Sequence, residues 1–206
     1  MDHQVQNRGN LAVRTGRPRE FDVDQALDRA LRVFWRKGYE ATSIQDLVDA
    51  TGVNRASLYE TFGTKRKLFR KALERYAGSK HNVAQATAET EPGMARIRAA
   101  LELAAEQTLK DGRGCMIVNA IVERAGQDRE MRRIGARTRA QLEDFFAGSL
   151  AEAERRGEIR SGQDRKALAR FLTNALFGLR VVAKTGGEKE EIRAIVRTTL
   201  ERIAER

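Results

Sequence analysis

Apolar residues recur at helical spacing from residue 21 to the C-terminus, and the chain contains only two prolines, Pro18 and Pro92. Because proline is the residue that most strongly breaks helices, long uninterrupted helices are permitted almost everywhere in this sequence. No segment shows the sustained alternation of apolar and polar residues that is typical of strands. We therefore expect an all-α protein of about nine helices.

Capping residues and glycines indicate where these helices begin and end. Aspartate, serine or asparagine side chains precede five of the apolar segments, and glycines follow most of them. Pro92 is expected in the first turn of its helix, a position that proline tolerates. The expected helices run over about 22–37, 43–51, 54–62, 64–76, 92–110, 115–124, 128–157, 164–186 and 188–206.

The segment 43–62 has the spacing of a helix-turn-helix, two short helices joined by a turn that contains Gly52. If Leu58 and Phe62 pack inward, the opposite side of the second helix is free to enter a DNA major groove. That side and its flanks carry Arg55, Ala56, Ser57, Tyr59 and Glu60. An arginine there can bind guanine, and a tyrosine can reach a phosphate. An ordinary helical hairpin has the same spacing, so the pattern alone leaves both interpretations open.

The chain carries a net charge of +10, and its basic residues gather at 1–19 and 55–75, whereas 20–54 is net acidic. Lys65, Arg66 and Lys67 fall in the first turn of a helix, where the helix dipole disfavours a cation by about 0.3–1 kcal/mol. We expect these three cations to be neutralised by an external anion such as phosphate, with Ser43 offering a second phosphate site. The alternative is a cluster of cations that is merely solvated. DNA fits this pattern, and a basic membrane-surface module is the alternative from another class.

Three motifs in the N-terminal third of the chain are specific in combination. They are Phe-x-x-x-Gly-Tyr-x-x-Thr-Ser from Phe34, Gly-Val-x-x-x-x-Leu-Tyr-x-x-Phe from Gly52, and Lys-x-x-Leu-Phe from Lys65. With these motifs, residues 17–76 resemble the DNA-binding domain of the TetR family of bacterial transcription regulators. Residues 1–18 are polar, contain Gly9, Gly16 and Pro18 and show no helical period, so they are predicted to form a flexible basic arm. The resemblance implies a three-helix helix-turn-helix domain at 19–66 and a helical-bundle domain for ligand binding and dimerisation at 67–206.

The resemblance also implies a homodimer, joined through the last two helices, that binds a palindrome-like operator in double-stranded DNA. Such a protein is typically a repressor that a small-molecule effector releases. The implied phosphate contacts are Thr42, Ser43, Tyr59 and Lys65, the implied base contacts are Arg55, Ala56 and Ser57, and Arg17 and Arg19 of the arm are implied to add further contacts. Glu60 departs from the family pattern: it either accepts a hydrogen bond from a cytosine N4 amine or points away from the DNA.

Cys115 supports a second hypothesis about release from DNA. It precedes an apolar helix and lies two residues from Arg113, an environment that favours oxidation or attack by electrophiles. The alternative is that this thiol is a small packing residue beneath the pocket, and Asn119 and Glu123 either bind the effector or cap neighbouring backbone. The residues expected in the effector pocket or sensor are Cys115, Met116, Asn119, Glu123, Phe145, Phe171 and Leu176.

Other classes of protein find little support in the sequence. The glycine-rich stretches do not continue into a phosphate-binding loop, and one cysteine and two scattered histidines give no metal-ligand spacing. We therefore expect no enzyme activity, no cofactor and no metal. The longest apolar run has four residues and the N-terminus has no hydrophobic segment, so we expect a cytoplasmic protein without a membrane span.

Overall fold

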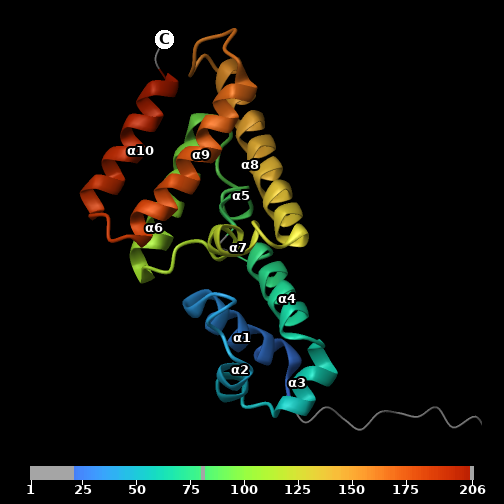
Figure 1. Ribbon diagram of the computed structural model, residues 1–206. Helices are drawn as coiled ribbons and strands as arrows, with labels where there is room; N and C mark the ends of the chain where they lie inside the picture. Colours follow the sequence, from blue (N-terminus) through green and yellow to red (C-terminus); the bar gives the residue numbers. More distant parts are fainter. Residues whose placement is uncertain (1–20, 80–81, 205–206) are drawn as a thin grey trace, which may run out of the picture.

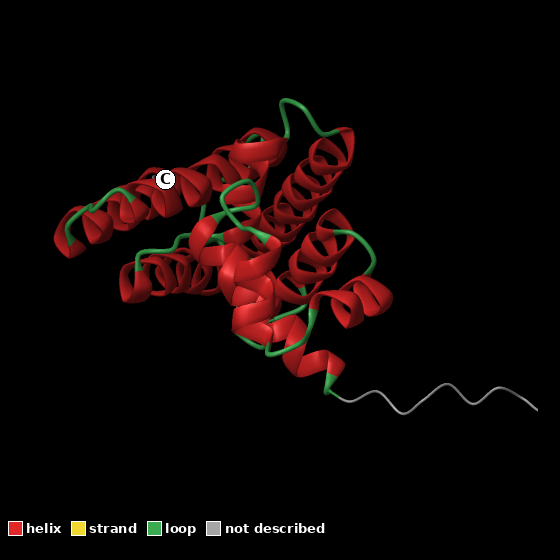
Figure 2. Ribbon diagram, turned by 60° about the horizontal axis from the view of Figure 1, so that its bottom comes forward, coloured by secondary structure: helices red, strands yellow, loops and turns green. Residues whose placement is uncertain are grey.

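The computed structural model describes residues 21–79 and 82–204, and these residues form ten α-helices without a strand (Figure 1, Figure 2). Each of the nine expected helices corresponds to one of them, so the all-α prediction is confirmed. The helices are α1 Val23–Lys37, α2 Ile44–Thr51, α3 Arg55–Phe62, α4 Lys65–Ala77, α5 Val83–Ala86, α6 Met94–Asp111, α7 Met116–Arg124, α8 Arg129–Arg155, α9 Arg165–Lys184 and α10 Lys189–Ala204.

The structure differs from the expected helices at α5 and at the start of α6. Helix α5 is a single turn of four residues, too short to show a helical period, and was not expected. Helix α6 begins at Met94, so the expectation that Pro92 lies in its first turn is wrong. The N–H of Met94 donates to a carboxylate oxygen of Glu158 at 2.8 Å, and Gly93 turns the chain into the helix with a φ of 97°.

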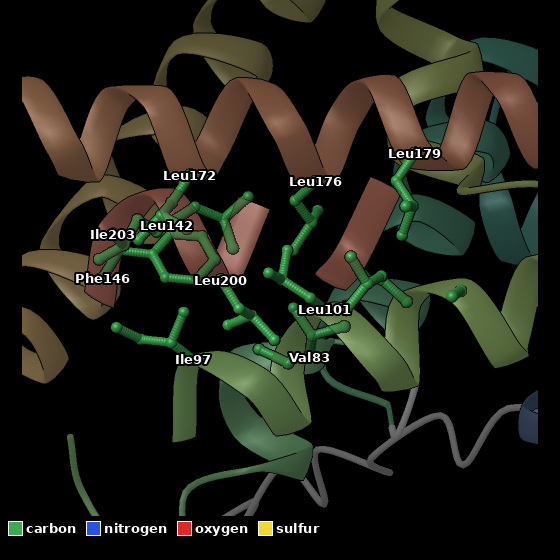
Figure 3. Close-up of a cluster of buried hydrophobic side chains, with 14 of the residues drawn as sticks. Val83, Ile97, Leu101, Leu142, Phe146, Leu172, Leu176, Leu179, Leu200 and Ile203 are labelled. Atoms are coloured by element: carbon green, nitrogen blue, oxygen red, sulfur yellow. The ribbon is translucent and has the colours of Figure 1, made fainter. Parts of the chain in front are cut away.

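The buried apolar side chains form two cores. The first joins α1, α2, α3 and α4 with three residues of α7 and one of α8. The second joins α5, α6, α8, α9 and α10, and Figure 3 shows its close-packed side chains. In Figure 1, α1, α2 and α3 lie at one end of the molecule, the bundle lies at the other, and α4 and α7 lie between them. Helix α7 therefore belongs to the core of the N-terminal helices, although it is remote from them in sequence.

The expected domain boundary between residues 66 and 67 falls in the first turn of α4. Buried residues of α4 as far as Tyr76 belong to the first core, so this helix is packed with the N-terminal helices along most of its length. The expected basic arm at 1–18, with Arg17, and the adjoining Arg19 lie outside the described residues. Within the described ranges, none of the helices is long and apolar enough to cross a membrane, and no metal-binding cluster is found.

Candidate functional site

The turn between α2 and α3 is fixed by capping at both of its ends. Ser43 and Asp46 form a reciprocal capping box at the start of α2. Gly52 ends α2 in the left-handed conformation with a φ of 72°, and the Asn54 side chain accepts the N–H of Ser57 at the start of α3. Leu58 and Phe62 are buried, and this fixes which side of α3 faces outward.

The outward side of α3 is the candidate surface for reading DNA. Arg55, Ala56, Tyr59 and Glu60 are exposed, and Ser57 is half-buried at the edge of the same surface. The Arg55 guanidinium lies 5.7 Å from the centre of the Tyr59 ring, so the longest side chains at this end of the helix lie together. Within the described part of the chain, no carboxylate–cation pair involves Glu60, and its carboxylate is therefore open to an external donor.

The loop before α2 presents Ser43 and buries Thr42. The Thr42 hydroxyl donates to the Gly38 carbonyl at 2.5 Å, and this side chain is fully buried. Its observed role is therefore to hold the loop, in contrast to the phosphate contact that the resemblance implies. Ser43 is exposed at the N-terminus of α2, where the helix dipole favours an anion. A hydrogen bond from Lys37, assisted by bonds from Ser43, lowers the pKa of the Asp46 carboxyl to about 2.

The three cations at the start of α4 differ in their surroundings. Arg66 pairs with Asp128 at 2.9 Å and with Glu130 at 3.3 Å. Although burial opposes it, the first backbone N–H groups of α8 lower the pKa of Asp128, so this partner stays ionised. The expectation that all three cations need an external anion is therefore wrong for Arg66, whose partners are remote in sequence. Lys65 and Lys67 are the two cations of this turn that form no ion pair with a carboxylate in the described structure.

Lys65 is held in place by an aromatic ring. Its Nζ lies 4.4 Å from the centre of the Tyr39 ring, and the Arg124 guanidinium lies 4.6 Å from the same ring. Partial burial lowers the pKa of Lys65, while the carboxylates of Glu123 and Asp46 act in the opposite direction. The ammonium is thus held in a defined position beside the helix-turn-helix.

Helix α7 is bonded to the loop that leads into α2. The two carboxylate oxygens of Glu123 accept the N–H groups of Tyr39 at 2.9 Å and Glu40 at 2.8 Å. The neighbouring Arg124 forms an ion pair with Glu40. Glu123 therefore takes the backbone-capping role that was the alternative to effector binding. These contacts tie α7 to the segment that presents Ser43.

A cavity of about 280 Å³ lies among α4, α5, α7, α8 and α9. Of the residues expected in a pocket, Cys115 and Leu176 line this cavity. Sequence reasoning missed its other polar lining residues, which are Tyr76, Asn82, Thr138, Gln141 and Arg180. Arg180 lies within an apolar stripe of α9. A charged residue in an apolar stripe was the one sequence signal that could have pointed to Arg180 as a cavity residue.

The remaining expected pocket residues lie elsewhere. Met116 is buried in the first core, and Phe145 packs against the second. The Asn119 amide donates to the Arg113 carbonyl at 2.8 Å and accepts from Lys184 at 3.1 Å. Phe171 is 47% exposed on the outer side of α9. The cavity therefore brings together two of the seven expected residues.

Tyr76 connects this cavity to the N-terminal helices. Its ring packs edge-on against Trp35 of α1, with 5.0 Å between ring centres. The Trp35 indole N–H donates to the Gly114 carbonyl at 2.9 Å, and the Arg113 guanidinium lies 3.8 Å from the Trp35 ring centre. The loop that carries Cys115 is thus bonded directly to α1.

Comparison with known families matches both parts of the chain. Residues 26–72 match the family model described as bacterial regulatory proteins, tetR family. Residues 93–199 match the model described as a tetracyclin repressor-like C-terminal domain. The chain is 36% identical over 192 residues to YezE of Bacillus subtilis (strain 168), an uncharacterized HTH-type transcriptional regulator, covering 90% of this chain and 97% of the relative.

Two further proteins are similar over most of their length. The chain is 34% identical over 189 residues to ComR of Escherichia coli (strain K12), an HTH-type transcriptional repressor, and the match covers 90% of each protein. Among solved structures, it resembles a cysteine mutant of CifR, a TetR family transcriptional regulator complexed with 26-base-pair operator DNA. That match has a TM-score of 0.73 and 30% identity, and it covers 90% of this chain and 98% of the CifR chain.

Proposed function

Since this chain belongs to the TetR family of bacterial transcriptional regulators, we propose that it is a cytoplasmic, homodimeric repressor released from its operator by a small molecule. The observation that carries the DNA-binding part is the exposed side of α3, with Arg55 and Glu60 at its surface. Ser43 at the start of α2 and Lys65 at the start of α4 lie on the two flanking helices. The α3 residues Arg55, Ala56 and Ser57 then read bases, while Ser43, Tyr59 and Lys65 hold phosphates.

The repressor function is tested by fluorescence anisotropy with duplex DNA from the region upstream of the protein's own gene. A shuffled duplex and a salt series serve as controls. We expect a preference of about 1,000-fold or more for the native duplex. Equal, salt-sensitive binding to both duplexes would contradict operator recognition, and binding to anionic vesicles instead of DNA would favour the membrane-surface alternative.

A homodimer presents two copies of α3 to the two halves of a palindrome, about 34–36 Å or a multiple of this apart. The outer side of α9 supports this assembly, because Phe171 and Val181 are exposed there at 47% and 46%. Large apolar side chains on one exposed helix side are typical of a subunit interface. The exposed side of α10 completes the proposed four-helix contact.

The dimer is tested by sedimentation of the wild type and of the Phe171→Glu variant. We expect the wild type to sediment as a dimer and Phe171→Glu to shift toward monomer. Val122→Glu is the matched control, because Val122 is 78% exposed but lies on α7. A monomeric wild type, or equal dissociation of both variants, would contradict the assignment to α9.

Release by a small molecule is assigned to the cavity of about 280 Å³, since Tyr76 in its wall packs against Trp35 of α1. An occupant that moves Tyr76 therefore acts on the core that positions α3. The contact between the Tyr76 and Trp35 rings thus connects the cavity to the helix-turn-helix directly, without involving the long helices of the bundle.

Modification of Cys115 is a second candidate for the releasing event. The thiol is half-buried, lines the same cavity and is the N-cap of α7. It is also the chain's only cysteine, so Cys115→Ser removes every thiol. If the thiol is the sensor, diamide releases operator DNA from the wild type and not from Cys115→Ser. Release from both proteins, or from neither, would exclude this candidate.

A further inference from the structure

The cavity is small and has two chemically different parts. Its volume of about 280 Å³ lies below the roughly 300–1,000 Å³ of sites for drug-sized ligands, so its occupant is a small molecule. One part of the lining is apolar and includes Val83, Ile117, Leu142, Leu176 and Phe177. The polar side chains are contributed by α4, α8, α9 and the residues that flank α5 and α7.

Arg180 sets the charge of the cavity wall. It is the one charged side chain among the described residues of the lining, and no described carboxylate lines the cavity. The residue is 3% exposed, and one of its terminal nitrogens donates to the Gln107 side chain at 3.2 Å. Arg180 therefore gives the cavity wall a positive charge.

The N-terminus of α7 reinforces this positive potential. Cys115 lines the cavity as the N-cap of α7, and its side chain makes no capping hydrogen bond. The Tyr76 hydroxyl lies beside the Cys115 thiol and the Met116 N–H. Burial, followed by the neighbouring Cys115, raises the pKa of the Tyr76 hydroxyl above its ordinary value. A guanidinium, a phenol and the positive end of a helix thus belong to one small wall.

We propose that this cavity binds a small organic carboxylate with a short apolar body, and that this class of molecule is the effector. The carboxylate lies against Arg180 and the N-terminus of α7, and the apolar body packs on Leu142, Leu176 and Phe177. An amine of the same shape would leave a buried cation beside another cation, and a neutral amide would lose the charge-assisted hydrogen bonds. The assignment of this class as effector rests on the proposed function, whereas binding itself does not.

The chain carries its own reporter for this test. Trp35 is the only tryptophan, and its ring packs on Tyr76, which lines the cavity. The full-length protein is titrated with hexanoate, hexanamide and hexylamine, probes of nearly equal size that do not absorb where tryptophan is excited. We expect a saturable change in Trp35 fluorescence with hexanoate, and binding of the amide and the amine weaker by about tenfold or more.

Variants then locate the carboxylate. Arg180→Met is expected to lose the preference for hexanoate over hexanamide, while Arg98→Met, which changes an exposed arginine of α6, keeps it. Thermal unfolding and operator binding show that each variant is folded. If Arg180→Met does not fold, the three probes on the wild type still decide the question. Absence of hexanoate binding, or equal binding of the amide, would overturn the proposal.

Operator release is measured separately by anisotropy with the same probes. Hexanoate that binds selectively and releases DNA supports both the ligand class and its effector role. Hexanoate that binds selectively but leaves the protein on DNA supports the carboxylate site and overturns its effector role. If DNA binding itself is absent while hexanoate binds, the proposed repressor function fails and the carboxylate site stands.

Discussion

Glu123 of α7 binds the loop that precedes α2, and substituting this residue should lower the stability of the first core by an amount that can be calculated. Its two carboxylate oxygens accept two backbone N–H groups, at 2.9 and 2.8 Å. Side-chain caps of exposed backbone donors contribute about 0.5–2 kcal/mol. Glu123→Gln keeps one acceptor and turns an amide N–H toward the second donor, so we expect the free energy of unfolding to fall by about 1–2 kcal/mol.

Urea denaturation followed by Trp35 fluorescence measures this loss, since Trp35 lies in the first core. With a urea dependence of about 2–3 kcal/mol per molar, the midpoint should fall by roughly 0.5 M at fixed protein concentration. Glu102→Gln is the control, because Glu102 forms only an exposed pair with Arg98 at 3.7 Å, and such pairs contribute about 0.5 kcal/mol or less. Equal midpoints for the two variants would refute the capping argument.

Three further predictions concern the DNA-binding surface. Tyr59→Phe and Lys65→Ala should weaken binding to all duplexes alike, and the lysine change should lower the salt slope by about 1. Lys110→Ala on α6 is the control, and unchanged affinity in both variants would contradict the proposed contacts. Arg55→Ala should relax specificity at one base pair by about 1–3 kcal/mol in a competition assay, and an unaltered preference would remove it as a base reader. The hydrogen bond from Lys37 lowers the pKa of the Asp46 carboxyl from 3.8 to about 2. The ionised carboxylate therefore stabilises the folded protein fully above pH 3.8, and this stabilisation is lost as the pH falls toward 2. Asp46→Asn should flatten the dependence of stability on pH in that window, which acid titration at fixed salt would reveal.

The helix starts and the buried side of α3 could be predicted, because they depend on residues that are close together in the sequence. Helix starts at Ser43, Asn54 and Asp128 were predicted because a cap and the N–H groups that it accepts lie within three residues. The buried side of α3 followed from the spacing of Leu58 and Phe62, because a helix fixes which side chains share a face.

Features that depend on contacts between distant segments could not be predicted in the same way. Arg66 looked unpaired because its carboxylate partners are more than sixty residues away. Glu123 carried no local sign that it would cap Tyr39, eighty-four residues earlier. Arg180 reaches the cavity only because α9 packs beside α8 and α6. Local patterns therefore gave the outer surface of α3, whereas the cavity depended on tertiary packing.

Residues that belong both to the cavity wall and to the first core limit how this protein can evolve. Tyr76 and Ile117 line the cavity and also belong to the core that supports α3, so a substitution at either position alters both. Thr138, Gln141 and Phe177 line the cavity from α8 and α9 and lie outside that core. A lineage that acquires a new effector while keeping its operator should therefore change the α8 and α9 wall first and retain Tyr76 and Ile117.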